Sequence, residues 1–515
     1  MEFLGELLIP LAEGAALLSK LDIWVLAVVG VAYGIFAGAM PGIGTTLAYG
    51  LVLPFTFPMD PVQAVAFLLS ISVGTGFGNS IPAILLSVPG TPAAVLTAMD
   101  GFKLHKRGES GLALGISFIA AIVGQLISIP FFVLLVVPLS GLAYVFLAPE
   151  LFGLYLFGMV AIVSLTGKNL LKGLAGAAFG LAIAFVGIDA MNGTPRFAPI
   201  PEFRNGFETA PAVIGLLAVS ELFRQSRQSF QWNAVIEEFS AKFPAWSQIR
   251  RTIGPIVGGT VLGTLVGAIP GAGATPAAMI SYQQAQAWSK HPEEFGNGSI
   301  EGIAANEAAQ NASNSGELIP TLGIAIPGSG SMVLLLASLQ VHGLVPGPLL
   351  IRQTPELLYA AVAGMLAASL ILIVTGWWIS RQLLKIITID RSLVVILALA
   401  TTVIGVFSLQ FRLFDVLTAL GLGVVGYFML RYGYSTAAAA LAVVLARGFE
   451  RSLRQGLNLF DNSIIEFLSR PLTAIIVGAA VVFLVVGIRR TMRFQREEAR
   501  VRQQAIVEAG RLPAE

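Results

Sequence analysis

Long runs without a charged residue follow one another along most of the chain. Ten of them contain no Asp, Glu, Lys or Arg. They cover residues 23–59, 61–99, 111–149, 151–167, 252–289, 318–351, 357–380, 392–411, 416–430 and 471–488. A helix of about 20 apolar residues spans a bilayer, so several of these runs are long enough to cross it twice. The pattern predicts a protein that crosses a lipid bilayer many times.

The apolar runs are continuous, and they are rich in Ala, Leu and Gly. A membrane β-barrel would instead show strands of about ten residues with alternating character. The whole chain is 56% hydrophobic and 12% charged, whereas soluble domains carry about 25% charged residues. We therefore expect an all-α polytopic integral membrane protein, with about 10–12 membrane crossings. The chain has no Cys, which excludes disulfides and thiol chemistry.

Two short motifs occur twice, in the same order. GAMPGIG at 38–44 returns as GAIPGAG at 267–273, an offset of 267 − 38 = 229 residues. SIPAILLSVPG at 80–90 pairs with ELIPTLGIAIPG at 317–328, where Pro82 matches Pro320 at an offset of 320 − 82 = 238. The larger second offset implies an insertion, which we place around the charged stretch 289–298. Two ordered motif pairs predict two related transmembrane repeats, as in many transporters.

Charged residues outside the apolar runs indicate the orientation. Arginines crowd the tail after the last run, and basic residues also gather between 221 and 251. Positive residues mark the cytoplasmic side of a membrane protein, which explains the tail better than a nucleic-acid site would. The acidic residues Glu2, Glu6 and Glu13 precede the first span, and Lys20 is the only basic residue there. This excess of negative charge favours an N-terminus outside.

These signals divide the chain into four parts. We expect a first transmembrane repeat over 1–223, a cytoplasmic linker over 224–249, a second repeat over 250–466, and a terminal transmembrane helix with a basic cytoplasmic tail over 467–515. An outside N-terminus and an inside linker require an odd number of crossings in the first half. The two repeats are then inverted relative to one another.

Each of the four motifs is predicted to break a transmembrane helix. Proline removes a backbone donor, and glycine adopts dihedral angles that are closed to other residues. Such a break inside a bilayer is tolerated mainly where it lines a cavity. The helix after the break begins with free N–H groups and a positive dipole end, which suit a carboxylate. A single glycine-rich segment is more often only a packing surface, but four paired breaks favour one shared site near the midplane.

The candidate substrate- or ion-binding residues are the prolines and glycines of the breaks and the hydroxyl and amide side chains near them. They are Pro41, Gly42, Gly44, Thr45, Thr46, Asn79, Ser80, Pro89, Gly90, Thr91, Pro270, Gly271, Gly273, Thr275, Asn311, Asn314, Pro327, Gly328, Ser329 and Ser331. Hydroxyls at these positions can cap a half-helix or reach a ligand. Free carbonyl and side-chain oxygens would suit Na⁺ as a coupling ion. We expect no other cofactor and no catalytic residue.

Polar residues in 301–317 share one face of a predicted helix. Glu307, Asn311 and Asn314 are spaced i, i+4 and i+7, with alanines opposite. An ordinary solvated helix is the competing interpretation. The matching stretch of the first half offers only hydroxyl and amide groups, among them Asn79 and Ser80, so the halves would contribute unequally.

The motifs resemble a known family. GAMPGIGTTLAYGLVLPFTF, PGTPAAVLTAMDGFKLHKRG, GAIPGAGATPAAMISY and IPGSGSMVLLLASLQVHGLVPGP are similar to the TctA family, the large membrane subunit of bacterial tripartite tricarboxylate transporters. The resemblance covers nearly the whole chain. Its signature matches this sequence at Pro41, Gly42, Gly44, Pro89, Gly90, Pro270, Gly271, Gly273, Pro327 and Gly328.

Membership of that family implies a multi-pass protein of the bacterial inner membrane. Its partners would be a small TctB-like membrane subunit and a periplasmic TctC-like solute-binding protein. The complex would import carboxylates by using an ion gradient and no ATP.

Secondary active import of small di- or tricarboxylates is therefore the leading hypothesis, with Na⁺ or H⁺ as the coupling ion. A passive channel for small organic anions is the alternative, because the same broken helices could line a pore. A membrane enzyme is disfavoured: the sequence shows no nucleophile and base pair and no phosphate-binding loop, and its histidines are His105, His291 and His342, far apart. Neither the particular carboxylate nor the coupling ion follows from the sequence.

Overall fold

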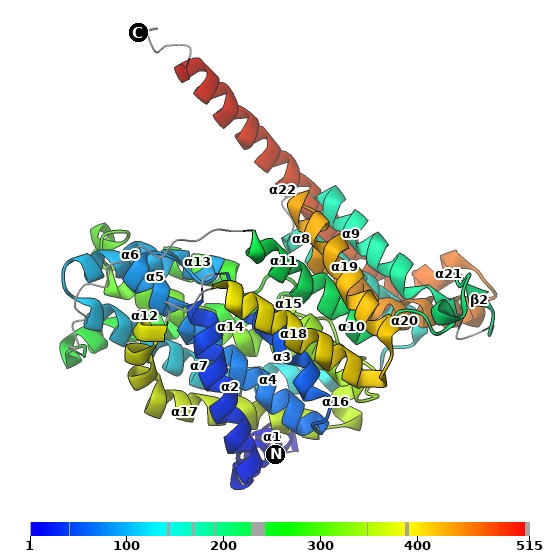
Figure 1. Cartoon of the computed structure of the whole chain (residues 1–515), viewed down its shortest axis with the longest axis horizontal. Coiled ribbons are helices and arrows are strands. Elements are labelled where there is room, and N and C mark those ends of the chain that lie inside the picture. The colour runs from blue at the N-terminus through cyan, green and yellow to red at the C-terminus, as the bar shows by residue number, and fades with distance from the viewer. Residues whose placement is uncertain are drawn as a thin grey trace.

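The structure is a computed structural model that describes residues 2–40, 42–141, 145–166, 170–189, 192–227, 243–347, 349–386 and 391–509. Helices dominate the described chain (Figure 1). The α-helices are α1 Glu2–Ala16, α2 Leu21–Ala39, α3 Thr45–Thr56, α4 Pro61–Gly78, α5 Ser80–Leu86, α6 Val95–Lys106, α7 Ser110–Gly141, α8 Ala148–Thr166, α9 Leu170–Ala184, α10 Thr209–Ile214, α11 Ser220–Ser226, α12 Trp246–Gly267, α13 Ala274–Trp288, α14 Ile300–Ile324, α15 Gly330–Val341, α16 Leu350–Gln353, α17 Glu356–Ile386, α18 Arg391–Gln410, α19 Leu413–Arg431, α20 Thr436–Leu459, α21 Ile464–Ser469 and α22 Pro471–Ala509.

Short elements connect these helices. A π-helical segment, η5 Gly215–Val219, joins α10 to α11, and 3₁₀ turns lie at η1 Leu17–Ser19, η2 Pro92–Ala94, η4 Pro201–Asn205 and η6 Pro292–Glu294. Two strands of two residues, β1 Gly187–Ile188 and β2 Pro195–Arg196, pair antiparallel. The predicted all-α architecture is confirmed for the described residues.

Among the described residues, six helical segments are long and apolar enough to cross a membrane. They are Leu21–Ala39, Pro61–Leu86, Ser110–Gly141, Glu356–Ile379, Leu413–Arg431 and Pro471–Arg489. Shorter apolar helices, such as Thr45–Thr56 and Gly330–Val341, accompany them. The chain is therefore a multi-pass membrane protein, while the number of about 10–12 crossings stays a prediction.

The helix α14 lies at the centre of the molecule. Every residue from Ile300 to Gly323 is buried, and α14 packs against α7, α12 and α13. Small residues permit this packing: a methyl group on Gly124 of α7 would lie 2.6 Å from the carbonyl oxygen of Ala308. The interpretation of this stretch as an ordinary solvated helix is wrong, because small side chains let neighbouring helices close over both of its faces.

All four predicted helix breaks are present. The chain leaves helical geometry between α2 and α3, between α5 and η2, between α12 and α13, and between α14 and α15. We call the first two breaks, residues 40–44 and 87–91, the first-half tips, and the last two, residues 268–273 and 325–329, the second-half tips.

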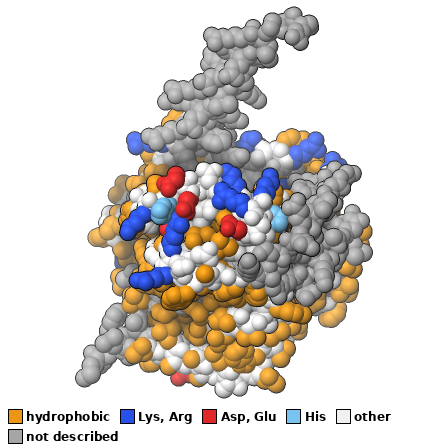
Figure 2. All heavy atoms as spheres, turned by 90° about the vertical axis from the view of Figure 1, so that its left-hand side faces the viewer, with side chains coloured by type: hydrophobic (Ala, Val, Ile, Leu, Met, Phe, Trp, Pro, Cys, Tyr) orange, Lys and Arg blue, Asp and Glu red, His pale blue; other side chains and the backbone are white. Residues whose placement is uncertain are grey.

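Many charged side chains lie at the periphery. Figure 2 shows Lys, Arg, Asp, Glu and His side chains gathered in the upper part of one face, above an area of mostly hydrophobic side chains. The helix α22 extends away from the rest of the molecule (Figure 1). Residues 228–242 of the predicted linker, and the side chains of the basic tail from 493 onward, lie outside the description. The four-part division of the chain stays a prediction.

Candidate functional site

The tips of each half are joined to one another by a backbone hydrogen bond. In the first half, the Gly42 N–H donates to the Gly90 carbonyl at 3.3 Å. In the second half, the Gly271 N–H donates to the Gly328 carbonyl at 2.9 Å. Gly42 has a φ of 85° and Gly271 a φ of 78°, in the left-handed region that favours glycine. Both glycines therefore allow the sharp turn that brings two breaks together.

The helices that lead into the second break of each half also end alike. Ser87 after α5 and Ala325 after α14 both have a φ of 56°. The next residue, Val88 or Ile326, donates its N–H to the carbonyl of Pro82 at 3.2 Å or of Pro320 at 3.0 Å. A left-handed residue and this backward hydrogen bond close a helix C-terminus. The chain is thereby directed into the tip in the same way in both halves.

The half-helices α3 and α15 begin side by side. A methyl group on Gly330, the first residue of α15, would lie 3.1 Å from the Thr46 hydroxyl oxygen in the first turn of α3. Further along, the hydroxyls of Thr56 and Ser338 are 2.9 Å apart, and the His342 Nε2 lies 2.8 Å from the Met59 carbonyl oxygen. The two helices therefore run in parallel. Their N-terminal ends, which carry free N–H groups and positive dipole ends, meet at one place.

Polar side chains surround this meeting point. The hydroxyls of Thr45 and Thr75 lie 2.8 Å apart, and those of Ser329 and Ser331 also lie 2.8 Å apart. The Thr91 hydroxyl is buried and has no hydrogen-bond partner among the described residues. These groups offer hydroxyl donors and acceptors beside the two helix ends.

Other predicted site residues serve contacts between the halves. The Ser80 hydroxyl donates to the Glu307 carboxylate at 2.7 Å. The Asn79 Oδ1 accepts from the Gln310 amide at 3.1 Å. These hydrogen bonds hold the junction of α4 and α5 against α14.

The two predicted asparagines of α14 differ in their surroundings. The Asn314 side-chain amide donates to the Gln125 Oε1 at 3.3 Å. Asn311 donates to the Glu307 carbonyl at 3.0 Å, while its Oδ1 is buried without a described partner. A methyl group on Gly76 would lie 2.2 Å from that oxygen, so the glycine makes room for it.

The remaining predicted residues line the same breaks. Gly44 and Gly273 are the N-cap residues of α3 and α13, and Thr275 is half-buried in the first turn of α13. Pro89 precedes the bonded Gly90, while Pro270 and Pro327 are buried directly before Gly271 and Gly328. Pro41 lies outside the described residues.

Sequence reasoning missed three polar residues, two that contact the tips and one that contacts Asn79. Gln225 of α11 donates to the Gly42 carbonyl at 2.9 Å. Gln310 of α14 donates to the Gly76 carbonyl at 2.9 Å. Glu317 accepts from the Ser329 hydroxyl at 2.5 Å. Glu317 had a sequence signal, because it opens the second-half motif, whereas the contacts of Gln225 depend on the fold.

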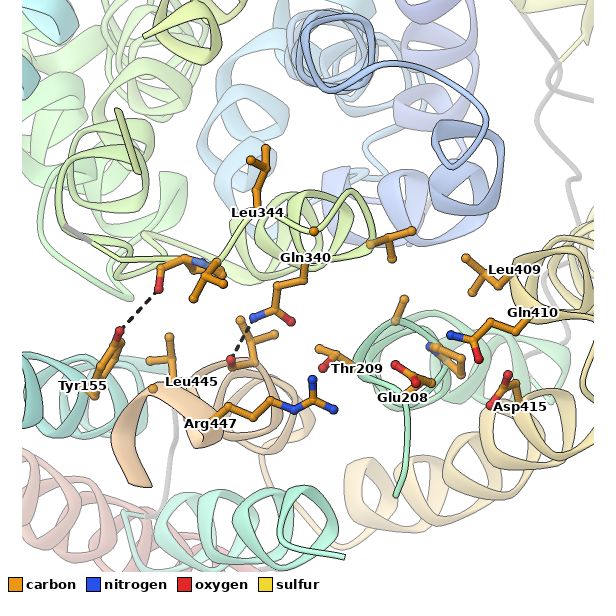
Figure 3. A pocket seen from close by; sticks show the side chains of 18 residues that line it. Tyr155, Glu208, Thr209, Gln340, Leu344, Leu409, Gln410, Asp415, Leu445 and Arg447 are labelled. Atoms are coloured by element: carbon orange, nitrogen blue, oxygen red, sulfur yellow. Dashed lines mark hydrogen bonds between the residues drawn. The ribbon is translucent and has the colours of Figure 1, made fainter. Parts of the chain in front are cut away.

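A cavity of about 410 Å³ lies away from the tips, at the C-terminal end of α15 (Figure 3). Its walls include Glu208, Gln340, Asp415 and Arg447, and none of the predicted site residues lines it. The Tyr155 hydroxyl donates to the Pro346 carbonyl at its edge (Figure 3). Because α15 has 12 residues and a helix rises about 1.5 Å per residue, the cavity is separated from the tips by the length of this helix.

Comparison with known proteins decides the family. Residues 24–441 match the model of the tripartite tricarboxylate transporter TctA family. The chain belongs to the TctA family. The family that the sequence motifs indicated is thus confirmed. The matched residues include all four tips. A transporter component, rather than an enzyme, is consistent with this family.

Two proteins of Agrobacterium vitis are similar to this TctA-family chain. An uncharacterized 52.8 kDa protein in the TAR-I ttuC' 3' region is 30% identical over 476 residues, which cover 92% of this chain and 95% of that protein. An uncharacterized protein in the TAR-II ttuC' 3' region is 30% identical over 230 residues, 45% of this chain and 95% of that protein. No solved structure matches the chain.

Proposed function

We propose that the chain is the large membrane subunit of a secondary active transporter that imports small di- or tricarboxylates. It would act with a TctB-like small membrane subunit and a TctC-like periplasmic solute-binding protein. A gradient of Na⁺ or H⁺ would drive uptake across the bacterial inner membrane, and the C-terminus would face the cytoplasm. Family membership supports the general assignment, and the tips support the mechanism.

The observation that carries the proposal is the meeting of α3 and α15 at Thr46 and Gly330. Two parallel half-helices direct their free N–H groups and positive dipole ends at one place inside the bundle. No basic side chain is needed to attract a carboxylate there. Half-helices of this kind bind anionic groups in other transporters.

We further propose that the two halves are inverted repeats around this site. The matched hydrogen bonds Gly42–Gly90 and Gly271–Gly328 support this proposal, as does a second pair of half-helices. The Tyr282 hydroxyl of α13 donates to the Asp100 carboxylate of α6 at 2.7 Å, so these helices also lie side by side. From the tips, α6 and α13 run toward the exposed contact between Lys103 and Asn297. The pair α3 and α15 instead runs toward the contact between Met59 and His342.

In this mechanism the carboxylate binds at the tips, and one part of the bundle then moves against the other to expose the site to the cytoplasm. The side-chain hydroxyls of Thr46, Ser329 and Ser331 would orient the bound carboxylate. The glycines at the tips would let its oxygen atoms approach the backbone closely.

Uptake into vesicles that contain the chain and both partner subunits tests the proposal. Labelled succinate, malate and citrate are compared with and without a Na⁺ or proton gradient. Accumulation against a concentration gradient is expected for at least one of them. Uptake that persists after the gradient collapses, without accumulation, would instead indicate a passive channel.

Two variants test the position of the site. Gly42→Leu and Gly271→Leu place a large side chain at the joined tips and should abolish uptake, while both proteins still insert into the membrane. Normal transport by both variants would contradict the assignment of the tips.

A further inference from the structure

The carboxylate of Glu317 is buried at the second-half tips, and its environment differs from that of every other buried carboxylate among the described residues. Four of the seven carboxylates that are buried in the described part of the chain pair with an arginine. These pairs are Glu150–Arg470, Asp189–Arg454, Glu301–Arg251 and Asp415–Arg412. A buried charge that is paired in this way is compensated.

Two further buried carboxylates are satisfied by several neutral donors. Asp100 accepts from the Tyr282 hydroxyl and from the backbone N–H groups of Gly298 and Ser299. Glu307 accepts from the hydroxyls of Ser80 and Thr97 on its two oxygens. Both side chains are thereby held in fixed hydrogen-bond networks.

Glu317 is 4% exposed, and the described residues give it a single hydrogen bond, from the Ser329 hydroxyl to its Oε2. Within the described residues, no Lys, Arg or His pairs with it. Its Oε1 faces the Gly273 bend, where a methyl group on the glycine would lie 3.7 Å away. An ionised carboxylate in such a place is unfavourable unless a positive charge accompanies it.

The first half has a neutral side chain at the position that corresponds to Glu317. Offset by the same 238 residues as Pro82 and Pro320, Glu317 corresponds to Asn79. The Asn79 side chain packs against Gly90, as Glu317 packs against Gly328. The two tip pairs are thus built alike but differ by one ionisable group.

We propose that Glu317 binds the co-transported cation, and that its neutralisation allows an anionic carboxylate to bind at the adjoining ends of α3 and α15. Ser329, which bonds Glu317, is the N-cap residue of α15, and Gly330 next to it meets Thr46. A charged Glu317 therefore lies at the helix end that would attract the substrate. Two negative charges that are close together and shielded from bulk water repel one another strongly. A cation on Glu317 removes the repulsion, which couples the two binding events. This inference rests on the proposed transport function.

Exchange of labelled citrate and of labelled succinate in proteoliposomes, with the chain and its partner subunits, tests the proposal. The half-saturating substrate concentration is measured over a series of Na⁺ concentrations at fixed pH, and over a series of pH values without Na⁺. In the wild type, the effective cation should strengthen substrate binding roughly tenfold or more, within the usual range of coupling energies. The Glu317→Gln variant should exchange substrate with no dependence on that cation and should fail to accumulate it.

Glu307→Gln is the matched control, because it makes the same change at another buried carboxylate of α14. It should keep the cation dependence of the wild type. Equal cation dependence in Glu317→Gln and the wild type would overturn the proposal for Glu317 alone. If substrate binding by the wild type depends on neither cation, the coupled transport mechanism is overturned as well. The two results therefore distinguish failure of the Glu317 proposal from failure of the proposed function.

A second variant covers the case in which Glu317→Gln does not fold, as judged by size-exclusion chromatography. Ser329→Ala keeps the carboxylate but removes its hydrogen-bond donor. The half-saturating concentration of the effective cation should then shift from its wild-type value. An unchanged value would overturn the proposal.

Discussion

Replacement of Gly271 by alanine tests whether the tips require glycine for its shape. Gly271 has a φ of 78°, and an added methyl group would lie 2.8 Å from the Cα of Ile162 in α8. The left-handed backbone costs a residue with a side chain roughly 1–2 kcal/mol. The clash with a neighbouring backbone adds about 1–3 kcal/mol, the usual range for overpacking.

Gly108→Ala is the matched control for this change. Gly108 also has a φ of 78°, but a methyl group there would meet no described atom within 4 Å. The control therefore isolates the backbone strain of roughly 1–2 kcal/mol, and Gly271→Ala should be the more destabilised variant by about 1–3 kcal/mol.

The assay compares the thermal stability of both variants in detergent by fluorescence-detected size exclusion, and their uptake in vesicles. We expect a larger drop in the midpoint of unfolding and a loss of uptake for Gly271→Ala, with near-normal uptake for Gly108→Ala. Equal destabilisation of the two variants would refute the reasoning, because it would show that contact with α8 does not constrain this tip.

Two other contacts give predictions about stability. Ser80→Ala removes a donor to the buried Glu307 carboxylate and should lower the free energy of unfolding by about 1–3 kcal/mol, the range for a buried group left unsatisfied; an unchanged unfolding midpoint would contradict the role of this contact. Arg470→Met removes the arginine that bonds Glu150 at 2.6 Å and leaves that carboxylate with Thr473 and the Leu147 N–H. It should lower thermal stability at neutral pH more than at acidic pH, where a protonated Glu150 needs no partner, and equal losses at both pH values would count against the ion pair.

The sequence was sufficient to predict the breaks but not their partners. Each Pro-Gly motif interrupts a helix, because the chemistry of these residues acts locally. The hydrogen bond between Gly42 and Gly90 joins residues far apart in the chain. It depends on how α2, α4 and α5 pack, which no local pattern specifies.

The burial of α14 illustrates a second limit. Its sequence is polar enough to resemble a solvated helix, yet alanines and glycines permit close approach by α7 and α12. Hydropathy measures transfer to lipid and takes no account of small residues that allow polar side chains to pair inside a bundle. For the same reason, the hydroxyl donors of Glu307 and the isolation of Glu317 become visible only in the structure.

The crossings show a third limit. Apolar runs suggest a crossing wherever about 20 residues are available. The helices α3 and α15 have 12 residues each, which reach about 18 Å. Such half-helices are too short to span the hydrocarbon layer alone.

The central claim, that the carboxylate binds where α3 meets α15, can be tested by labelling single cysteines. The chain contains no Cys, so Thr46→Cys and Ser331→Cys each introduce the one thiol of the protein. Thr209→Cys, in the wall of the 410 Å³ cavity, is the control. In vesicles with the partner subunits, the transported carboxylate should slow labelling at positions 46 and 331 by a polar thiol reagent and leave labelling at position 209 unchanged. Protection at 209, with none at 46 or 331, would contradict the claim and place the substrate in the cavity.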